Sequence, residues 1–273
     1  MKDYSVLMSV YAGENSEFLS QSIESMIKQT VPSNNFVLVC DGSLTNELDL
    51  VVARYESENP DVFHVVRLEK NVGLAMALNA GLKHCENEYV ARMDSDDIAS
   101  PNRMQKQLDA INDADILGCY VSEFTTKPGD SQTVRVVPTN QEDIKAFARR
   151  RNPFNHPSVL YKKSSVLQAG GYEKFPLCED YHLWIKMLLN GCTAVNISEP
   201  LVYMRVGSGM HKRRGGWAYF KSMLNFRRWM RQAGFSSLSD FWFCAAGHFV
   251  SCLIPKSMRK WMYNKFLRKQ NNF

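Results

Sequence analysis

Three acidic side chains fall within four consecutive positions of the chain, in the run Asp94-Ser95-Asp96-Asp97. The apolar segment 89–93 before them has the length and composition of a buried strand. Ligands of a parallel sheet bind beyond the carboxyl ends of its strands, so a site is expected here. Carboxylate oxygens suit Mg²⁺ or Mn²⁺, which commonly join carboxylates to a substrate phosphate. The alternative is an acidic turn before the next helix, and this short pattern alone does not separate the two.

Two further motifs end expected strands at the same edge. Asp41, in Asp41-Gly42-Ser43, can accept the imide hydrogen of a uracil ring or make only the local hydrogen bonds of a turn. Asn71 and Gly73 open a helix after another strand, where backbone amides can approach an anion or simply cap the helix. The residues alone leave both alternatives open.

Glu179 and Asp180 begin an amphipathic segment, 179–189, with the apolar spacing of a helix. Acidic residues in a first helical turn complement the helix dipole, which would be reason enough for their presence. A carboxylate at the edge of a site is also a suitable general base for an alcohol nucleophile.

The surrounding pattern is that of a sheet covered by helices. Expected strands at 5–10, 36–40, 63–68 and 89–93 alternate with expected helices at 18–29, 46–57 and 74–84. This alternation predicts an α/β fold with a Rossmann-like, mainly parallel central sheet and helices on both faces. Ser100-Pro101 predicts the start of a further helix. Later segments predict strands at 116–121, 133–137 and 158–161, and helices at 217–233, 238–253 and 256–269.

Composition narrows the class of protein. Neither GxGxxG nor GxxxxGK[ST] occurs, which removes the main support for a dinucleotide-binding or P-loop protein. Seven cysteines without a CxxC pair argue against a disulfide framework or a zinc ribbon and favour a reducing, cytoplasmic environment. No apolar stretch near the start has the length of a signal peptide.

Charge is distributed unevenly along the chain. Residues 205–273 hold 14 Lys and Arg against one acidic residue, Asp240, a net charge of +13, whereas residues 1–204 carry a net charge of −8. The tail interleaves its basic residues with Trp and Phe at helical spacing, so we expect it to bind an anionic membrane surface without crossing the bilayer. The apolar stretch 241–254 is too short for a transmembrane helix. Packing of these aromatics on the rest of the protein is the alternative.

In order and spacing, seven short motifs together resemble family 2 glycosyltransferases, most closely the bacterial enzymes that extend O-antigen, capsule or exopolysaccharide repeat units. The motifs are SVLMSVYAGE (5–14), VCDGS (39–43), NVGL (71–74), ARMDSDD (91–97), HPS (156–158), GGY (170–172) and EDY (179–181). The resemblance implies a GT-A fold, a nucleotide-sugar donor, a divalent metal and inversion at the anomeric carbon. Ser9 and Ala12 replace the usual Pro and Asn of the first motif.

The resemblance also implies roles for individual residues. The catalytic base would be Asp180, with His156 and Glu179 on the acceptor side. The metal ligands would be Asp96 and Asp94, with His211 as a further candidate. The donor would be held by Val10, Tyr11, Glu14, Asp41, Asn71, Gly73, Asp94, Ser95 and Arg205. Arg205 and His211 fall in a basic, Gly-rich stretch whose composition suits a lid over phosphate.

These observations predict an inverting transferase that moves a sugar from a UDP-sugar to a hydroxyl of a polyprenyl-diphosphate-linked saccharide. The catalytic domain would span 1–212, with a nucleotide-sugar half at about 1–100 and an acceptor half at about 101–212, followed by a helical extension at 213–273 on the inner membrane face. The alternatives are a sugar-nucleotide nucleotidyltransferase, which would need a Gly-rich basic loop after the first strand, and a nucleic-acid-binding protein using the basic tail. The acidic first 204 residues argue against the latter, so no nucleic acid partner is expected.

Overall fold

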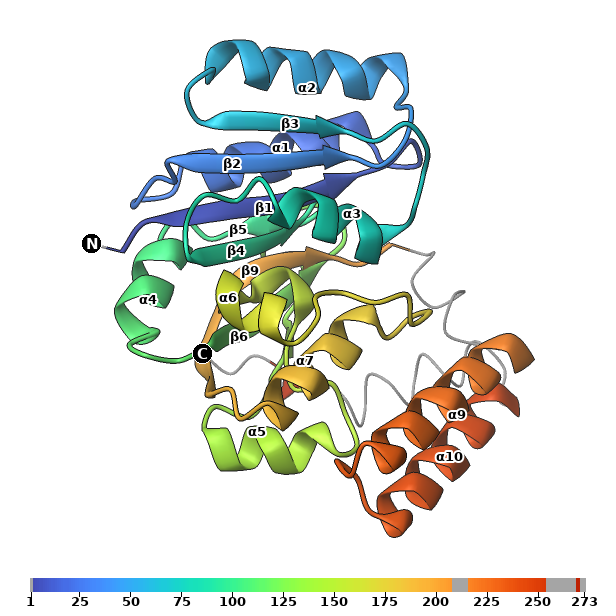
Figure 1. Ribbon diagram of the computed structural model, residues 1–273. Coiled ribbons are helices and arrows are strands. Elements are labelled where there is room, and N and C mark those ends of the chain that lie inside the picture. Colours follow the sequence, from blue (N-terminus) through green and yellow to red (C-terminus); the bar gives the residue numbers. More distant parts are fainter. Residues whose placement is uncertain (1, 208–215, 254–268, 271–273) are drawn as a thin grey trace.

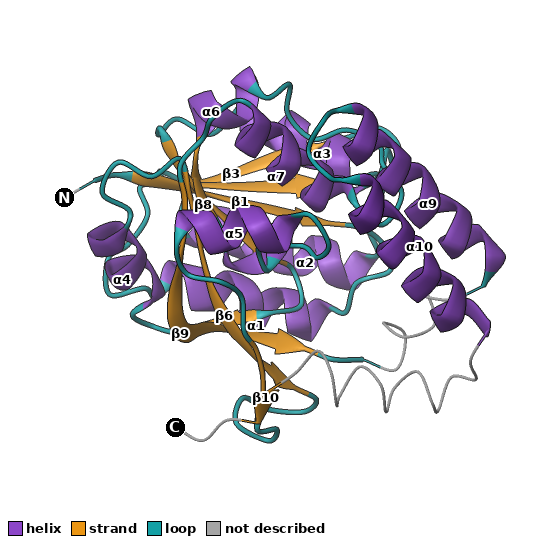
Figure 2. Cartoon of the chain, turned by 90° about the horizontal axis from the view of Figure 1, so that it is seen from below, coloured by secondary structure: helices purple, strands orange, loops and turns teal. Residues whose placement is uncertain are grey.

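A computed structural model of the 273-residue chain describes residues 2–207, 216–253 and 269–270. Its central feature is a twisted mixed sheet whose strands follow the order β10-β7-β6-β8-β4-β1-β2-β3, with β9 pairing both β6 and β5. Figure 1 shows this sheet with helices packed around it, and Figure 2 shows helices on both of its sides. The predicted mainly parallel α/β fold is confirmed.

Strands and helices alternate in the first part of the chain. The elements are β1 (Tyr4–Val10), α1 (Ser16–Ile27), β2 (Asn35–Cys40), α2 (Asn46–Glu58), β3 (Phe63–Arg67), α3 (Leu74–Leu82) and β4 (Tyr89–Asp94). The four strands are parallel, and the pairs Val10–Cys40 and Ser9–Asp94 place the carboxyl ends of β1, β2 and β4 side by side. The loops 11–14, 41–43 and 94–97 therefore lie at one edge of the sheet, here called the carboxyl edge.

The second part of the sheet contains antiparallel pairs. Its elements are β5 (Ile98–Ala99), α4 (Arg103–Ala110), β6 (Ile116–Phe124), β7 (Thr133–Arg135), α5 (Gln141–Ala148), a 3₁₀ turn η1 (His156–Ser158), β8 (Leu160–Lys162), α6 (Lys163–Gln168), α7 (Glu179–Leu189) and β9 (Ala194–Arg205). Because β8 runs antiparallel to β4, the turn η1 that precedes β8 lies near the carboxyl edge.

Buried strands supply two separate cores because successive side chains alternate between the faces of a sheet. On β1, Leu7 packs into a cluster with residues of α3, α7 and α9. Its neighbours Val6 and Met8 pack on the opposite face with residues of α1, α2 and α4. Both faces are covered, which explains why β1 and β2 are almost continuously apolar.

The C-terminal helices α9 (Trp217–Gln232) and α10 (Leu238–Leu253) form a hairpin. One face of α9 belongs to the main core: Tyr219, Met223, Phe226 and Met230 are buried in the cluster that contains residues of α7. The Arg227 guanidinium donates hydrogen bonds to the carbonyl oxygens of Arg149 and Arg150. The buried aromatic residues of α9, Tyr219 and Phe226, thus pack on the rest of the protein, whereas Trp217 is 69% exposed.

The structure differs from the sequence-based expectations at a helix start and at one strand, and a third expectation lies almost wholly outside the described residues. The helix expected at Ser100-Pro101 begins at Arg103, because residues 101–102 form a turn in which the Arg103 amide donates to the Ser100 carbonyl oxygen at 3.0 Å. Residues 98–99 before this turn pair with β9 as strand β5. Strand β9 was not predicted, since Pro200 and polar neighbours interrupt its apolar pattern and the pairing has register shifts there. The helix expected at 256–269 lies outside the described residues except for its last residue, Lys269, which belongs to the short strand β10 (Lys269–Gln270).

Within the described ranges, none of the helices combines the length and the apolar character needed to span a membrane.

Candidate active site

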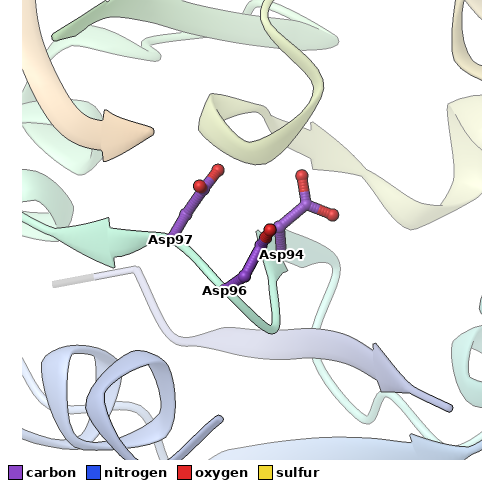
Figure 3. A group of neighbouring side chains, drawn as sticks. All are labelled: Asp94, Asp96 and Asp97. Atoms are coloured by element: carbon purple, nitrogen blue, oxygen red, sulfur yellow. The ribbon is translucent and has the colours of Figure 1, made fainter. Parts of the chain in front are cut away.

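Three carboxylates meet on the loop that follows β4. One oxygen from each of Asp94, Asp96 and Asp97 lies within 4.8 Å of the others, and Figure 3 shows the three side chains extending to the same side of this loop. Burial, together with the charges of Asp94 and Glu14, raises the pKa of Asp96 to about 7. Burial and Asp94 also raise the pKa of Asp97 well above its usual value. Three carboxylates this close ionise together only when a cation compensates their charge.

The chemistry of this cluster fits a hard divalent cation. The side chain of Asp97 is buried, and its Oδ2 has no hydrogen-bond partner among the described residues. A buried acceptor without a partner is costly, and coordination of a cation would satisfy it. Asp94 and Asp96 are partly exposed, so an ion held by these oxygens would retain positions for substrate.

Arg92, which is not among the residues predicted for the site, supports the cluster. Its buried guanidinium forms an ion pair with Asp94, while the Ser22 hydroxyl donates to the Asp94 carbonyl oxygen at 2.6 Å. Two residues apart on one strand, Arg92 and Asp94 lie on the same face of the sheet. The two-residue spacing of Arg92 and Asp94 is the sequence signal for this ion pair, because a buried arginine requires an anionic neighbour.

Arg205 lies at the end of β9 and not in the Gly-rich stretch where the lid was expected. Its guanidinium packs between the rings of Phe18 and Phe124, with 3.7 and 4.5 Å to the ring centroids. It donates to the Asp96 carbonyl oxygen at 3.0 Å and to Gln21 at 2.7 Å, and its backbone amide donates to Asp97 Oδ1 at 2.8 Å. In this structure Arg205 therefore holds the acidic loop.

The loop after β1 is joined to the acidic loop. Glu14 accepts a hydrogen bond from the Ser95 hydroxyl at 2.9 Å, which links two candidate donor-binding residues. The side chain of Tyr11 is 49% exposed at the carboxyl edge, whereas Val10 is buried as the last residue of β1. The structure thus brings Tyr11, Glu14 and Ser95 to the edge that carries the acidic cluster.

Asp41 binds the start of α3. Its carboxylate accepts hydrogen bonds from the backbone amides of Val72 at 2.7 Å and Gly73 at 3.0 Å, and its carbonyl oxygen accepts one from the Asn71 side chain. The backbone amide of Gly73, a candidate for binding an anionic group of the donor, therefore donates its hydrogen bond to the Asp41 carboxylate. Gly42 is required here, since its φ is +86° and a Cβ would lie 2.6 Å from the Asn71 nitrogen.

The acceptor-side candidates lie on η1 and at the start of α7. His156 Nε2 and the Tyr172 hydroxyl are 3.2 Å apart, and burial, aided by Arg92, lowers the pKa of His156 well below its usual value. Burial raises the pKa of the Tyr172 hydroxyl, and the negative charges of Asp180 and Asp94 act in the same direction.

Asp180 receives a hydrogen bond from Asn152 at 2.7 Å, a contact that no local sequence pattern indicated. Burial raises the pKa of the adjacent Glu179. His211 lies outside the described residues, as does most of the stretch expected to form a lid.

Comparison with known proteins identifies the family. The model of glycosyl transferase family 2 matches residues 5–169. The chain is 38% identical over 270 residues to the UDP-Gal:alpha-D-GlcNAc-diphosphoundecaprenol beta-1,3-galactosyltransferase of Escherichia coli, covering 97% of each chain. It is 36% identical over 268 residues to the amylovoran biosynthesis glycosyltransferase AmsE of Erwinia amylovora, covering 96% of this chain and 98% of the relative.

A solved structure shares the fold. The mannosyltransferase PcManGT of Pyrobaculum calidifontis, in complex with GDP-Man and Mn²⁺, superimposes with a TM-score of 0.63 at 18% identity, covering 93% of this chain and 77% of that one. The predicted family resemblance is confirmed, and with it a glycosyltransferase replaces the nucleotidyltransferase and nucleic-acid-binding alternatives. The chain belongs to glycosyl transferase family 2.

Proposed function

We propose that the protein is an inverting, metal-dependent hexosyltransferase of bacterial surface polysaccharide synthesis. It would transfer a sugar from a UDP-sugar to a hydroxyl of a saccharide linked to polyprenyl diphosphate. The observation that carries the proposal is the acidic cluster of Asp94, Asp96 and Asp97 at the carboxyl edge, in a chain that belongs to glycosyl transferase family 2. The 38% identity with an enzyme named for UDP-Gal and GlcNAc-diphosphoundecaprenol supports the choice of donor and acceptor class.

In this proposal one group of residues binds the nucleotide that leaves, and Asp180 activates the acceptor hydroxyl that attacks. Tyr11, Glu14 and Asp41 would hold the nucleoside, while Asp94 and Asp96 with Asp97 nearby would hold Mg²⁺ or Mn²⁺. When bound, the cation supplies Lewis-acid stabilisation of the charge on the departing diphosphate. Asp180 would accept the proton of the acceptor hydroxyl as its oxygen attacks the anomeric carbon and the bond to the nucleotide breaks. A single displacement assisted by one base inverts the configuration.

A donor and acceptor screen tests the proposal directly. Purified protein is incubated with UDP-sugars and GDP-sugars and a synthetic GlcNAc-diphosphate-lipid, with and without Mn²⁺, and products are detected by mass spectrometry. UDP-galactose is the first donor to test because the relative from Escherichia coli is named for it. Transfer only from GDP-sugars, or transfer that is equal in EDTA, would contradict the proposal.

Metal affinity should depend on pH because protons compete for the cluster. The pKa of Asp96 is about 7 in the absence of metal, so below pH 7 a cation must displace its proton. We expect the apparent affinity for Mn²⁺ to rise by up to about tenfold per pH unit between pH 5.5 and 7, and to level off above. Titration calorimetry at pH 5.5, 6.5 and 7.5 measures this slope, and the same affinity at all three values would refute it.

The proposal includes attachment to the inner face of the cytoplasmic membrane, where a lipid-linked acceptor is presented. On α10 a group of apolar side chains faces solvent, here called the α10 apolar face: Trp242 (64% exposed), Phe243 (64%), Phe249 (44%) and Val250 (48%). Exposed basic residues of the neighbouring α9, Arg228 and Arg231, lie on the same hairpin. Apolar contacts combined with cations are the means by which such helices bind anionic lipid surfaces, at about 1 kcal/mol per basic residue.

Co-sedimentation with vesicles tests this attachment in the full-length protein. Wild type should pellet with vesicles containing phosphatidylglycerol and be released by high salt. The pair of substitutions Trp242→Ser and Phe249→Ser should weaken binding about tenfold or more, because two exposed rings no longer enter the lipid. Leu50→Ser is the matched control, since Leu50 is 72% exposed on α2. Equal pelleting with neutral vesicles would show that the attachment is not electrostatic.

A further inference from the structure

We propose that Asn152 is a positioning residue that holds Asp180 in the orientation and charge state of a general base. Asn152 Nδ2 donates a hydrogen bond to Asp180 Oδ2 at 2.7 Å. The inference rests on the proposed function, because it concerns the carboxylate assigned there as the base. A neutral amide neither accepts nor supplies the reacting proton, so its part in the reaction is exerted through Asp180.

Contacts at the other end of the amide fix its orientation. Asn152 Oδ1 accepts the backbone N–H of Phe154 at 3.2 Å. With the oxygen used in this way, the NH₂ group faces the carboxylate. Phe154 is itself buried, with its ring edge-on to Trp184 at 5.9 Å between centroids. Asn152 therefore presents a donor from a well-packed position.

The two segments that meet at this hydrogen bond are also anchored. Just before Asn152, the carbonyl oxygens of Arg149 and Arg150 accept hydrogen bonds from the Arg227 guanidinium of α9, at 3.2 and 2.7 Å. In the first turn of α7, the Tyr181 hydroxyl donates to the Ala148 carbonyl oxygen at 2.7 Å. The loop and the helix start are thus held at a fixed separation, which is what a geometric role toward Asp180 requires.

Besides orienting Asp180, the side-chain amide of Asn152 affects the charge of this carboxyl group. The adjacent carboxylates of Glu179 and Asp180 repel each other, and burial together with this repulsion raises the pKa of Glu179. Tyr172 is a neutral phenol whose pKa burial raises. Arg151, the basic residue next to Asn152 in the chain, stacks its guanidinium on the ring of Phe147 of α5. A hydrogen bond donated to a carboxylate favours its ionised form. We therefore expect the hydrogen bond from Asn152 to favour the ionised, proton-accepting form of Asp180.

The test combines pH profiles with a double-mutant cycle in the full-length protein. Asn152→Ala should reduce kcat about tenfold and move the acidic limb of its pH profile upward by about one unit. The isosteric Asn152→Asp replaces the donor with a like charge and should move the limb further. Affinity for UDP and the melting temperature report on the remainder of the protein and should change little. Asn59→Ala is the control, since Asn59 is equally half-buried and donates to the Tyr55 carbonyl at the opposite edge of the sheet.

The cycle separates positioning from packing. If Asn152 acts through Asp180, adding Asn152→Ala to Asp180→Asn should cost no further activity. A further tenfold loss in that background, or an unmoved acidic limb in both single variants, would overturn the role of Asn152 while leaving Asp180 as the base. Full activity of Asp180→Asn would instead remove the proposed base and, with it, this inference.

Discussion

Replacing Asp180 by asparagine is expected to lower turnover by about a hundredfold or more, the range typical for loss of a general base. The amide keeps the size of the side chain but does not accept the proton of the acceptor hydroxyl. Affinity for UDP should hardly change, because the proposed nucleoside contacts lie on the loops after β1 and β2. Initial rates with donor and acceptor, together with calorimetry of UDP binding, measure the two quantities separately.

Glu179→Gln provides the comparison for this prediction. Glu179 is the other acidic residue in the first turn of α7, and its pKa is raised by burial. A much smaller loss of turnover is expected from this variant. An active Asp180→Asn enzyme beside an inactive Glu179→Gln enzyme would show that the base is Glu179.

Asp96→Asn is expected to abolish metal-dependent binding of UDP. Asp96 lies between Asp94 and Asp97 in the chain, and the three carboxylates approach within 4.8 Å. Loss of a direct ligand should exceed the roughly 10- to 100-fold cost of removing a residue that only supports a ligand. Calorimetry with UDP in the presence of Mn²⁺ should show affinity reduced at least a hundredfold, and EDTA should have the same effect on wild type.

Asp109→Asn is the matched control for this substitution. Asp109 is an exposed acidic residue of α4, hydrogen-bonded to Gln105, so its charge can be removed without touching the carboxyl edge. Its UDP affinity should equal that of wild type. Tight binding of UDP by Asp96→Asn, or undiminished turnover of wild type in EDTA, would rule out the metal assignment.

The parts of the fold that could be predicted are those with local signals. β1 to β4 are short runs rich in apolar residues and separated by helices, and a parallel arrangement then places the loops after β1, β2 and β4 at one edge. The family's motifs added order and spacing. Together these observations predict the parallel part of the sheet and the position of Asp94, Asp96 and Asp97 at its carboxyl edge.

The remaining features depend on contacts between distant residues. The hydrogen bond between Asn152 and Asp180 joins residues 28 apart in the chain, and no periodic pattern marks either as a partner. The packing of Arg205 between Phe18 and Phe124 likewise depends on strand β9, which the sequence did not predict because polar residues interrupt its apolar pattern. Arg92 is the exception, because its spacing from Asp94 on β4 was visible in the sequence.

The anchoring of the acidic loop by Arg205 has a consequence for the order in which the protein is made. Asp97 is 108 residues from Arg205 in the chain, and Gln21 is 184 residues from it. A nascent chain that has emerged as far as residue 200 already contains β1 to β4 and all three acidic residues, but lacks the guanidinium that holds their loop. Since closing such long stretches of chain is slow, we expect the acidic loop to reach its final shape only after β9 has been synthesised and docked. Nucleotide binding would then begin only once nearly the whole sheet has assembled.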